Sequence, residues 1–292
     1  MNRSRRKLLI RSAAALFAAM SGDTRAAMRP TIRIGLTPVI LDDQTLFLHR
    51  WREWLGRRLG APIEFIQRPR YRDITDLLLN RTLTAAWICG YPLVRNQKQL
   101  RLLAVPVYQG RPLYRSLILS GARGQTPTSI EQMAGQVFAF SDPDSNSGYL
   151  YPVYRLREVL RTQPGFFRRE FFTWGHRNTI EAVASGLADG GAVDSYVWQS
   201  MVQQYPHYAR QVRVVERSPE FGFPPIVTHK DLPNTLHQHL AATLHQMHAD
   251  PEGLELLKAL NLDRFEPGSE ADYAGIADMM MATDNLDLAI SR

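Results

Sequence analysis

The stretch TIRIGLTPVI, residues Thr31 to Ile40, alternates apolar and polar side chains and carries β-branched residues, so it predicts a first strand ending near Gly35. QTLFLHRWREWLGRRLG (Gln44 to Gly60) follows with apolar residues at helical spacing and a closing glycine, which predicts a helix. The next elements are predicted as a strand, a helix and a strand: PIEFIQRP (62–69), RDITDLLLNRTL (72–83) and AAWICG (85–90). This order predicts a mostly parallel α/β sheet, which binds ligands beyond the carboxyl ends of its strands.

Five later stretches predict a second α/β unit, with strands at 136–142 and 190–194 and helices at 151–160, 177–189 and 195–204. RVVERSPEFGFPPIVTHKDLP (213–233) then predicts a return crossing to the first unit. Two crossing segments would form a hinge, so we expect two mostly parallel lobes around a ligand cleft, residues 28–118 with 222–292 in lobe 1 and 119–221 in lobe 2. This layout is typical of periplasmic binding proteins.

The N-terminus predicts an export signal over residues 1–26. MNRSRRKLLIRSAAALFAAM is a basic head followed by an Ala/Leu-rich run that is short and interrupted by Arg11, so it is not expected to span a membrane stably. SRRKLLI (Ser4 to Ile10) resembles the twin-arginine export motif, and an ordinary signal peptide is the alternative. We therefore expect a soluble, monomeric protein of a bacterial periplasm.

Net charge and cysteine content narrow the function further. The formal net charge is +7, and residues 1–26 contribute +5 of it through six basic residues and one aspartate, which leaves +2 for the remainder. No concentrated basic face is then expected, which argues against nucleic-acid binding. The single cysteine, Cys89, cannot form an internal disulfide. No later stretch is long and apolar enough to predict a membrane helix.

The most polar stretch, SDPDSNSGYLYP (Ser141 to Pro152), lies between a predicted strand and a predicted helix. A helix starting near Ser145 leaves its first N–H groups unpaired, and its dipole favours an anion there. The hydroxyls of Ser145 and Ser147 add donors, and Gly148 leaves the approach open. The alternative is a serine-capped connection that binds nothing. Asp142 and Asp144 are expected to form the turn.

Several stretches carry a resemblance to one family: YRDITDLL before AAWICGYPLV, LAVPVYQGRPLYRSLI, FSDPDSNSGYLYP, TWGHRNTIEAVASGLADGGAVDSYVW and ERSPEFGFPPIV. In order and spacing they resemble the periplasmic phosphate/phosphite/phosphonate-binding proteins, the solute-binding components of ABC importers. The resemblance runs from about Thr31 to Val227. It implies the two-lobed type II fold with a hinged cleft, a small phosphorus oxyanion as ligand and an inner-membrane ABC permease as partner, with no catalysis, cofactor or metal.

The resemblance also implies a set of ligand-binding residues: Tyr71, Gly90, Tyr91, Tyr114, Ser145, Asn146, Ser147, His176 and Asp194. Core packing is the alternative for Gly90, Tyr91 and Tyr114, a half-buried position at the start of a helix is the alternative for Tyr71, and a structural role is the alternative for His176. Asp194 ends a predicted strand, so it could accept the proton of a P–OH group or simply cap the helix at Ser195. Asn146 departs from the family resemblance, because relatives commonly have threonine there; either the head group differs accordingly or Asn146 faces away from the ligand.

Two other functions stay open from the sequence alone. Cys89 suits a small buried hydrophobe, yet a thiol at a strand end facing the cleft could bind trivalent arsenic. Arsenite-binding sensory proteins, which signal to a histidine kinase, belong to the same broad family. Asp142, Asp144, His176 and Asp194 could in principle serve an enzyme, but they form no close metal-ligand motif, and no Gly-x-Ser-x-Gly or Walker motif occurs.

Overall fold

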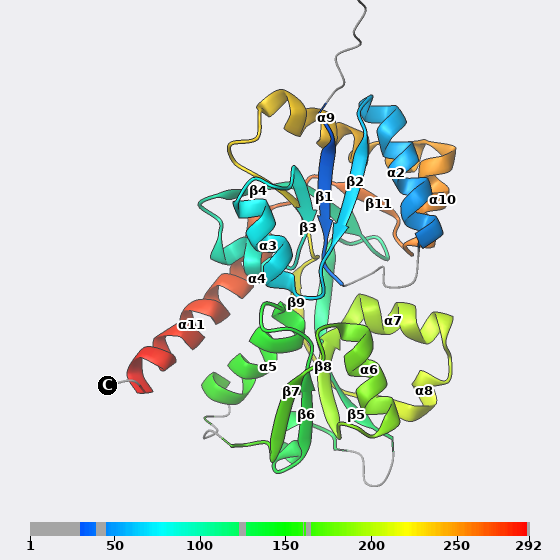
Figure 1. Ribbon diagram of the computed structural model, residues 1–292. Helices are drawn as coiled ribbons and strands as arrows, with labels where there is room; N and C mark the ends of the chain where they lie inside the picture. The colour runs from blue at the N-terminus through cyan, green and yellow to red at the C-terminus, as the bar shows by residue number, and fades with distance from the viewer. Residues whose placement is uncertain (1–29, 39–44, 123–126, 160, 162–164, 291–292) are drawn as a thin grey trace, which may run out of the picture. The chain divides into compact units, whose positions relative to one another are not determined.

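Two β-sheets organise the chain from Thr31 onward (Figure 1). The computed structural model describes residues 30–38, 45–122, 127–159, 161 and 165–290. The export signal predicted for residues 1–26 lies outside these residues. Within them, no helix is long and apolar enough to cross a membrane.

The first sheet has six strands in the order β11-β4-β10-β3-β1-β2. Its strands are β1 (Ile32–Leu36), β2 (Ile63–Gln67), β3 (Ala85–Trp87), β4 (Leu100–Val107), β10 (Ile226–His229) and β11 (Arg264–Glu266). The helices that lie next to these strands along the chain are α2 (Thr45–Leu59), α3 (Tyr71–Leu79), α4 (Gly90–Arg95), α9 (Asn234–His245), α10 (Pro251–Ala259) and α11 (Ala274–Ile290), with short 3₁₀ turns η4 (Met247–Ala249) and η5 (Glu270–Tyr273). The strand, helix, strand, helix, strand order predicted for residues 31–90 is confirmed as β1, α2, β2, α3 and β3.

The second sheet has five strands in the order β7-β6-β8-β5-β9. Its strands are β5 (Leu113–Gly121), β6 (Val137–Phe140), β7 (Arg169–Phe172), β8 (Gly190–Asp194) and β9 (Val212–Gly222). Its helical segments are η1 (Ile130–Met133), η2 (Asn146–Leu150), α5 (Tyr151–Tyr154), η3 (Arg155–Val159), α6 (His176–Ser185), α7 (Ser195–Gln204) and α8 (Tyr208–Gln211). The segments η2, α5 and η3 follow one another without a break, so the helix predicted at 151–160 begins earlier, at Asn146.

Both sheets are mixed, which corrects the expectation that they would be mostly parallel. β1 pairs in parallel with β2 and β3, and β6 pairs in parallel with β7 and β8. The other pairings are antiparallel, because β10 and β11 return late in the chain to the first sheet and β5 and β9 cross between the sheets. β5 and β9 pair along their lengths. The predicted lobe limits at 118/119 and 221/222 fall inside β5 and β9, which both belong to the second sheet. These limits stay predictions.

Helices cover both faces of the first sheet, and the side-chain alternation of β1 shows why. Leu36 lies in the apolar layer beneath α2 and α9, with Trp51 of α2. Gly35 points the opposite way, where a Cβ would lie 2.5 Å from Leu83 and 2.9 Å from Ile74 of α3. A side chain at Gly35 would therefore push α3 away from the sheet, and with it Tyr71 at the start of that helix (Figure 1).

Candidate functional site

Five of the predicted ligand-binding positions lie where a helical segment begins. Tyr71 opens α3, Gly90 opens α4, Asn146 opens η2, His176 opens α6, and Asp194 is the residue that caps α7. Each helix follows the carboxyl end of a strand, as α/β connections do. The first N–H groups of a helix carry its partial positive charge, so the ends of the sheets where these helices begin favour an anion.

The row Ser145, Asn146 and Ser147 is buried, with exposures of 0%, 0% and 1%. The Oγ atom of Ser145 accepts a hydrogen bond from the Gly148 N–H at 3.0 Å, so the capping role considered for this serine is present. Acceptance uses an oxygen lone pair, and the hydroxyl hydrogen remains a donor. The Ser147 carbonyl accepts from the Ser116 hydroxyl at 2.6 Å, which fixes the row against the second sheet.

Two side-chain atoms of this row are buried without a hydrogen-bond partner in the described part of the chain: Oδ1 of Asn146 and Oγ of Ser147. The Oγ atom of the neighbouring Ser141 is in the same condition. A buried polar atom left unpaired costs about 1–3 kcal/mol. Each of these atoms calls for a hydrogen-bond partner, and a polar ligand is one group that could supply it.

Gly148 has to be a glycine in this arrangement. A Cβ on it would lie 1.6 Å from Oγ and 2.7 Å from Cβ of Ser141. The same Cβ would lie 3.1 Å from Cε1 of His176, so the imidazole edge meets the polar row here. The absent side chain therefore brings His176 and the Ser145–Ser147 row together.

Asn146 joins three of the predicted positions. Its backbone N–H donates to Sγ of Cys89 at 3.2 Å, and its Nδ2 donates to the Tyr114 hydroxyl at 2.9 Å. The Tyr114 ring packs against Phe221 and Phe223 of the crossing segment. Burial raises the pKa of Tyr114 well above its ordinary value, so its hydroxyl stays protonated.

His176 and Asp194 form a second buried pair, 2% and 1% exposed. Nδ1 of His176 accepts from the Asp194 backbone N–H at 3.2 Å. Burial lowers the pKa of His176 to about 3, so the ring is neutral and carries its proton on Nε2 as a donor. Oδ1 of Asp194 accepts from the N–H groups of Tyr196 and Val197, which confirms the capping role.

The Asp194 carboxyl is poised to hold a proton. Burial raises its pKa to about 7, and the two capping N–H bonds oppose that rise. Asp194 is paired with Ser116 across β8 and β5, and Ser116 donates to the Ser147 carbonyl. The Asp194 carboxyl and the polar row are therefore held on the same strand pair.

Tyr71, Gly90 and Tyr91 approach from the first sheet. The Tyr71 backbone N–H donates to Oδ2 of Asp142 at 3.1 Å, and the side chain is fully buried. A Cβ on Gly90 would lie 2.7 Å from Ile276 and 3.0 Å from Tyr273, so this glycine serves close packing against the C-terminal helix. The Tyr91 ring lies under the guanidinium of Arg95 on the same helix. Ligand contacts by these three residues stay predictions.

Charged residues in the polar stretch hold the two sheets together, which the sequence did not indicate. Oδ1 of Asp142 accepts from the Asp144 N–H at 2.8 Å, so Asp142 forms the turn as expected. The Asp144 carboxylate instead contacts Arg72 of α3 and Arg95 of α4. These partners lie far from Asp144 in the sequence, and no local motif marks them.

Cys89 is a buried thiol, 3% exposed, at the N-terminal end of α4. Burial raises its pKa to about 11, so the sulfur is protonated at neutral pH. Its role in the structure is to pack in the core and to accept the Asn146 N–H. A buried thiol with a raised pKa is a poor nucleophile and a poor metal ligand.

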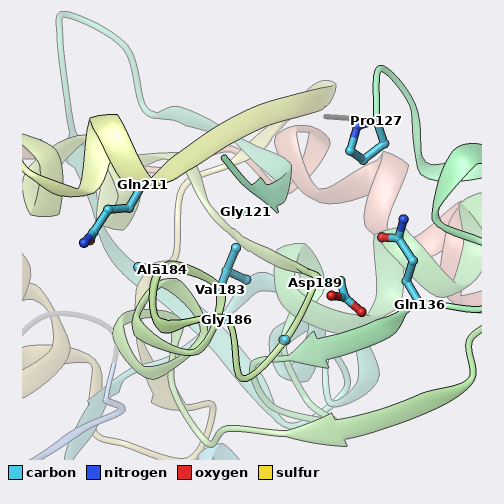
Figure 2. Close-up of a pocket in the computed structure, with 9 residues that line it drawn as sticks. Gly121, Pro127, Gln136, Val183, Ala184, Gly186, Asp189 and Gln211 are labelled. Atoms are coloured by element: carbon cyan, nitrogen blue, oxygen red, sulfur yellow. The ribbon is translucent and has the colours of Figure 1, made fainter. Parts of the chain in front are cut away.

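Two surface cavities lie outside this cluster. One of about 260 Å³ lies at the carboxyl ends of β1 and β2, on the first-sheet side where α3 begins, and is lined by Leu36, Pro38, Gln67, Arg68 and Pro69. The other, of about 240 Å³, lies at the amino ends of β6 and β8 in the second sheet, away from the ends where the helices of the candidate site begin (Figure 2). Asp189 lines the second cavity, and its carboxylate already accepts the Val137 N–H at 2.8 Å. This second cavity is therefore separate from the helix starts that carry the candidate site.

Two α/β sheets joined by paired crossing strands, with buried polar residues between them, define a two-lobed periplasmic binding protein, and the predicted fold class is confirmed. A binding protein component of an ABC phosphonate transporter from Pseudomonas aeruginosa shares this fold with a TM-score of 0.79 and 22% identity, over 89% of this chain and 88% of that one. PhnD1 of Prochlorococcus marinus, solved with methylphosphonate, matches with a TM-score of 0.77 and 17% identity, over 87% and 98%.

Sequence similarity gives the family. The family model described as the periplasmic substrate-binding protein of the phosphonate ABC transporter matches residues 34–273, and the chain belongs to this family. The phosphate-import protein PhnD of Mycolicibacterium smegmatis is 27% identical over 176 residues, which cover 56% of this chain and 55% of that protein. The match thus spans about half the length of that relative. The family consists of solute-binding transport proteins rather than enzymes, and these comparisons do not support the sensory alternative.

Proposed function

We propose that this protein captures a small phosphorus oxyanion, a phosphonate, phosphite or phosphate, between its lobes and delivers it in the periplasm to an inner-membrane ABC permease. The observation that carries this proposal is the buried Ser145–Ser147 row with its unpaired polar atoms. His176 approaches the row at Gly148, and the protonatable Asp194 is joined to it through Ser116. Tyr71, Gly90, Tyr91 and Tyr114 would complete the site from the first lobe and the crossing segment.

The proposed site binds an anion without a neutralising cation. Its donors are the serine hydroxyls and Nε2 of neutral His176, because the N–H groups of Asn146 and Gly148 are already bound to Cys89 and Ser145. These groups stabilise negative charge while keeping capture reversible, because no buried ion pair has to be broken on release. When Asp194 is ionised it accepts the proton of a P–OH group, and an oxyanion without such a proton would then face the carboxylate with a second negative charge.

Asn146 refines the proposed specificity. Its Nδ2 uses one of its two N–H donors on the Tyr114 hydroxyl, and its Oδ1 is buried without a partner among the described residues, so Oδ1 is an atom that a ligand donor would satisfy. That atom is an acceptor, whereas a threonine hydroxyl at this position could donate. We infer that the preferred head group carries a hydrogen donor toward Asn146, in addition to the proton shared with Asp194.

A thermal-shift panel of phosphate, phosphite, methylphosphonate, aminoethylphosphonate, sulfate, arsenate and arsenite tests the proposal. At least one phosphorus compound should stabilise the protein, sulfate should not, and Ser147→Ala should abolish most of the shift. Ser200→Ala is the matched control, because Ser200 on α7 also has a buried hydroxyl without a partner among the described residues. Stabilisation by none of the phosphorus compounds, or an equal loss in both variants, would overturn the proposal.

A further inference from the structure

Asp144 is a buried carboxylate whose charge is neutralised from the opposite lobe. It is 4% exposed and lies just after β6 of the second sheet. Arg72 of α3 contacts it through two nitrogens, Nε and Nη2, each at 3.1 Å, and Nη1 of Arg95 contacts it at 2.8 Å. Two guanidinium groups from helices of the first sheet thus converge on one carboxylate, and paired N–H···O contacts of this kind are strong and directional.

The position of Asp144 links these arginines to the candidate ligand site. It immediately precedes Ser145, and its own N–H is bound by Asp142. Asp142 in turn accepts the N–H of Tyr71, one residue before Arg72. The turn that starts the Ser145–Ser147 row is therefore attached to α3 and α4 at both of its aspartates.

We propose that Arg72 and Arg95 are positioning residues for the ligand site. By holding Asp144 from the opposite lobe they fix the Ser145–Ser147 row in the closed arrangement, and ligand affinity depends on them although neither arginine contacts the ligand. Arg95 has a second task in this scheme, because its guanidinium also covers the Tyr91 ring, 4.3 Å from the ring centroid. Opening of the lobes breaks both contacts to Asp144, so closure and placement of the row are coupled.

The exposure of the Arg72, Arg95 and Asp144 side chains predicts that removing the arginines and removing the carboxylate favour opening of the lobes to different extents. The Arg72 and Arg95 side chains are 62% and 40% exposed, whereas the Asp144 side chain is 6% exposed. Asp144→Asn leaves the arginines in contact with water, which solvates them. Loss of both arginines leaves a buried carboxylate without its cations, which is the more costly change. The Arg72→Gln/Arg95→Gln variant should therefore open more readily than Asp144→Asn.

Cys89 reports opening directly, because it is the only cysteine and its Sγ accepts the Asn146 N–H from the opposite lobe. The rate of its reaction with a thiol reagent, measured without ligand, should rise about ten-fold in Asp144→Asn and further in the double arginine variant. Glu64→Gln is the control, because it breaks the Arg33–Glu64 pair at the surface of the first lobe. The control should keep the wild-type rate.

Ligand affinity and melting temperature separate positioning from simple stability. With the phosphorus compound that gives the largest thermal shift, Asp144→Asn should bind about ten-fold more weakly while its melting temperature without ligand changes little. Asp144→Glu, which restores a carboxylate, should recover part of both the labelling protection and the affinity. Wild-type rates of Cys89 labelling in Asp144→Asn, Asp144→Glu and the Arg72→Gln/Arg95→Gln variant would overturn the inference. If labelling responds but no phosphorus compound binds, the positioning role stands and the proposed ligand class is wrong.

Discussion

Nδ1 of His176 accepts a hydrogen bond from the backbone N–H of Asp194 at 3.2 Å, which joins two buried titratable residues. The pKa values of their side chains are shifted in opposite directions. Burial lowers the pKa of His176 to about 3 and raises the pKa of Asp194 to about 7. Both shifts favour the neutral side chain, because burial penalises charge. Neutral His176 is a donor for an oxyanion. Because the pKa of Asp194 lies near 7, its carboxyl can hold or release one proton near neutrality, so it can share a proton with a bound oxyanion as proposed above.

The Asp194 shift predicts how stability without ligand depends on pH. A carboxyl whose folded pKa lies above its unfolded value of about 3.9 stabilises the fold fully below that value, and this stability is lost as pH rises through about 7. Between pH 5 and pH 8 the wild type should lose at most about 3 kcal/mol relative to Asp194→Asn. Urea unfolding of both proteins measures this. His176 acts in the opposite direction below its unfolded pKa of about 6.5 in both proteins, so it cancels in the comparison.

Asp231 supplies the control for that experiment. It is an exposed aspartate whose pKa is lowered, chiefly by its hydrogen bond to Arg81. The free energy of unfolding of Asp231→Asn should not increase relative to that of the wild type as pH rises from 5 to 8. A constant difference between wild type and Asp194→Asn across this range would show that Asp194 is ionised in the folded protein at acidic pH.

Ligand affinity should depend on pH through the same carboxyl. The proposed complex contains one proton shared between Asp194 and the ligand. Above the pKa of both groups, binding must take up that proton, and Kd should rise about ten-fold per pH unit. Asp194→Asn removes the requirement, so its Kd should be higher near neutrality and nearly independent of pH. Calorimetry from pH 6 to pH 9 checks this, and parallel pH profiles for the two proteins would exclude the proton-accepting role.

Gly148→Ala should disturb the site and the fold together. The new methyl group would overlap Ser141, and overpacking of a filled interior costs about 1–3 kcal/mol. Gly56→Ala is the matched control, because a Cβ at this position in α2 has its nearest atom at 3.4 Å and alanine favours a helix by about 0.5–1 kcal/mol. The free energy of unfolding measured in urea should therefore fall in Gly148→Ala and rise in Gly56→Ala.

Ser141→Gly in the Gly148→Ala background separates the clash from other effects. It removes the two Ser141 atoms that the new methyl would meet, at 1.6 and 2.7 Å. The double variant should regain stability relative to Gly148→Ala alone. Equal stability of the single and double variants would show that the clash with Ser141 is not the cause.

Features set by neighbouring residues could be predicted from the sequence, and features set by distant residues could not. The strand and helix order of residues 31–90 and the helix start beside Ser145 depend on local pattern and capping, and they are confirmed. The antiparallel pairings depend on where β10 and β11 insert in the first sheet and where β5 and β9 lie in the second, which involves strands far apart in the chain. The contacts of Asp144 with Arg72 and Arg95 join residues 72 and 49 positions apart, so no window of sequence contains them.

Asn146→Thr tests whether residue 146 sets ligand preference. The variant loses the hydrogen bond from Nδ2 to Tyr114 and replaces the unpaired Oδ1 with a hydroxyl that can donate. The order of thermal shifts among phosphate, phosphite and the phosphonates should change, while the free energy of unfolding falls by about 0.5–1.5 kcal/mol. Asn96→Thr is the control, because the Asn96 amide also makes one hydrogen bond, to the Pro92 carbonyl at 2.9 Å, outside the row. An unchanged ligand order in Asn146→Thr would assign residue 146 to holding Tyr114 and Cys89 in place, with specificity set elsewhere in the row.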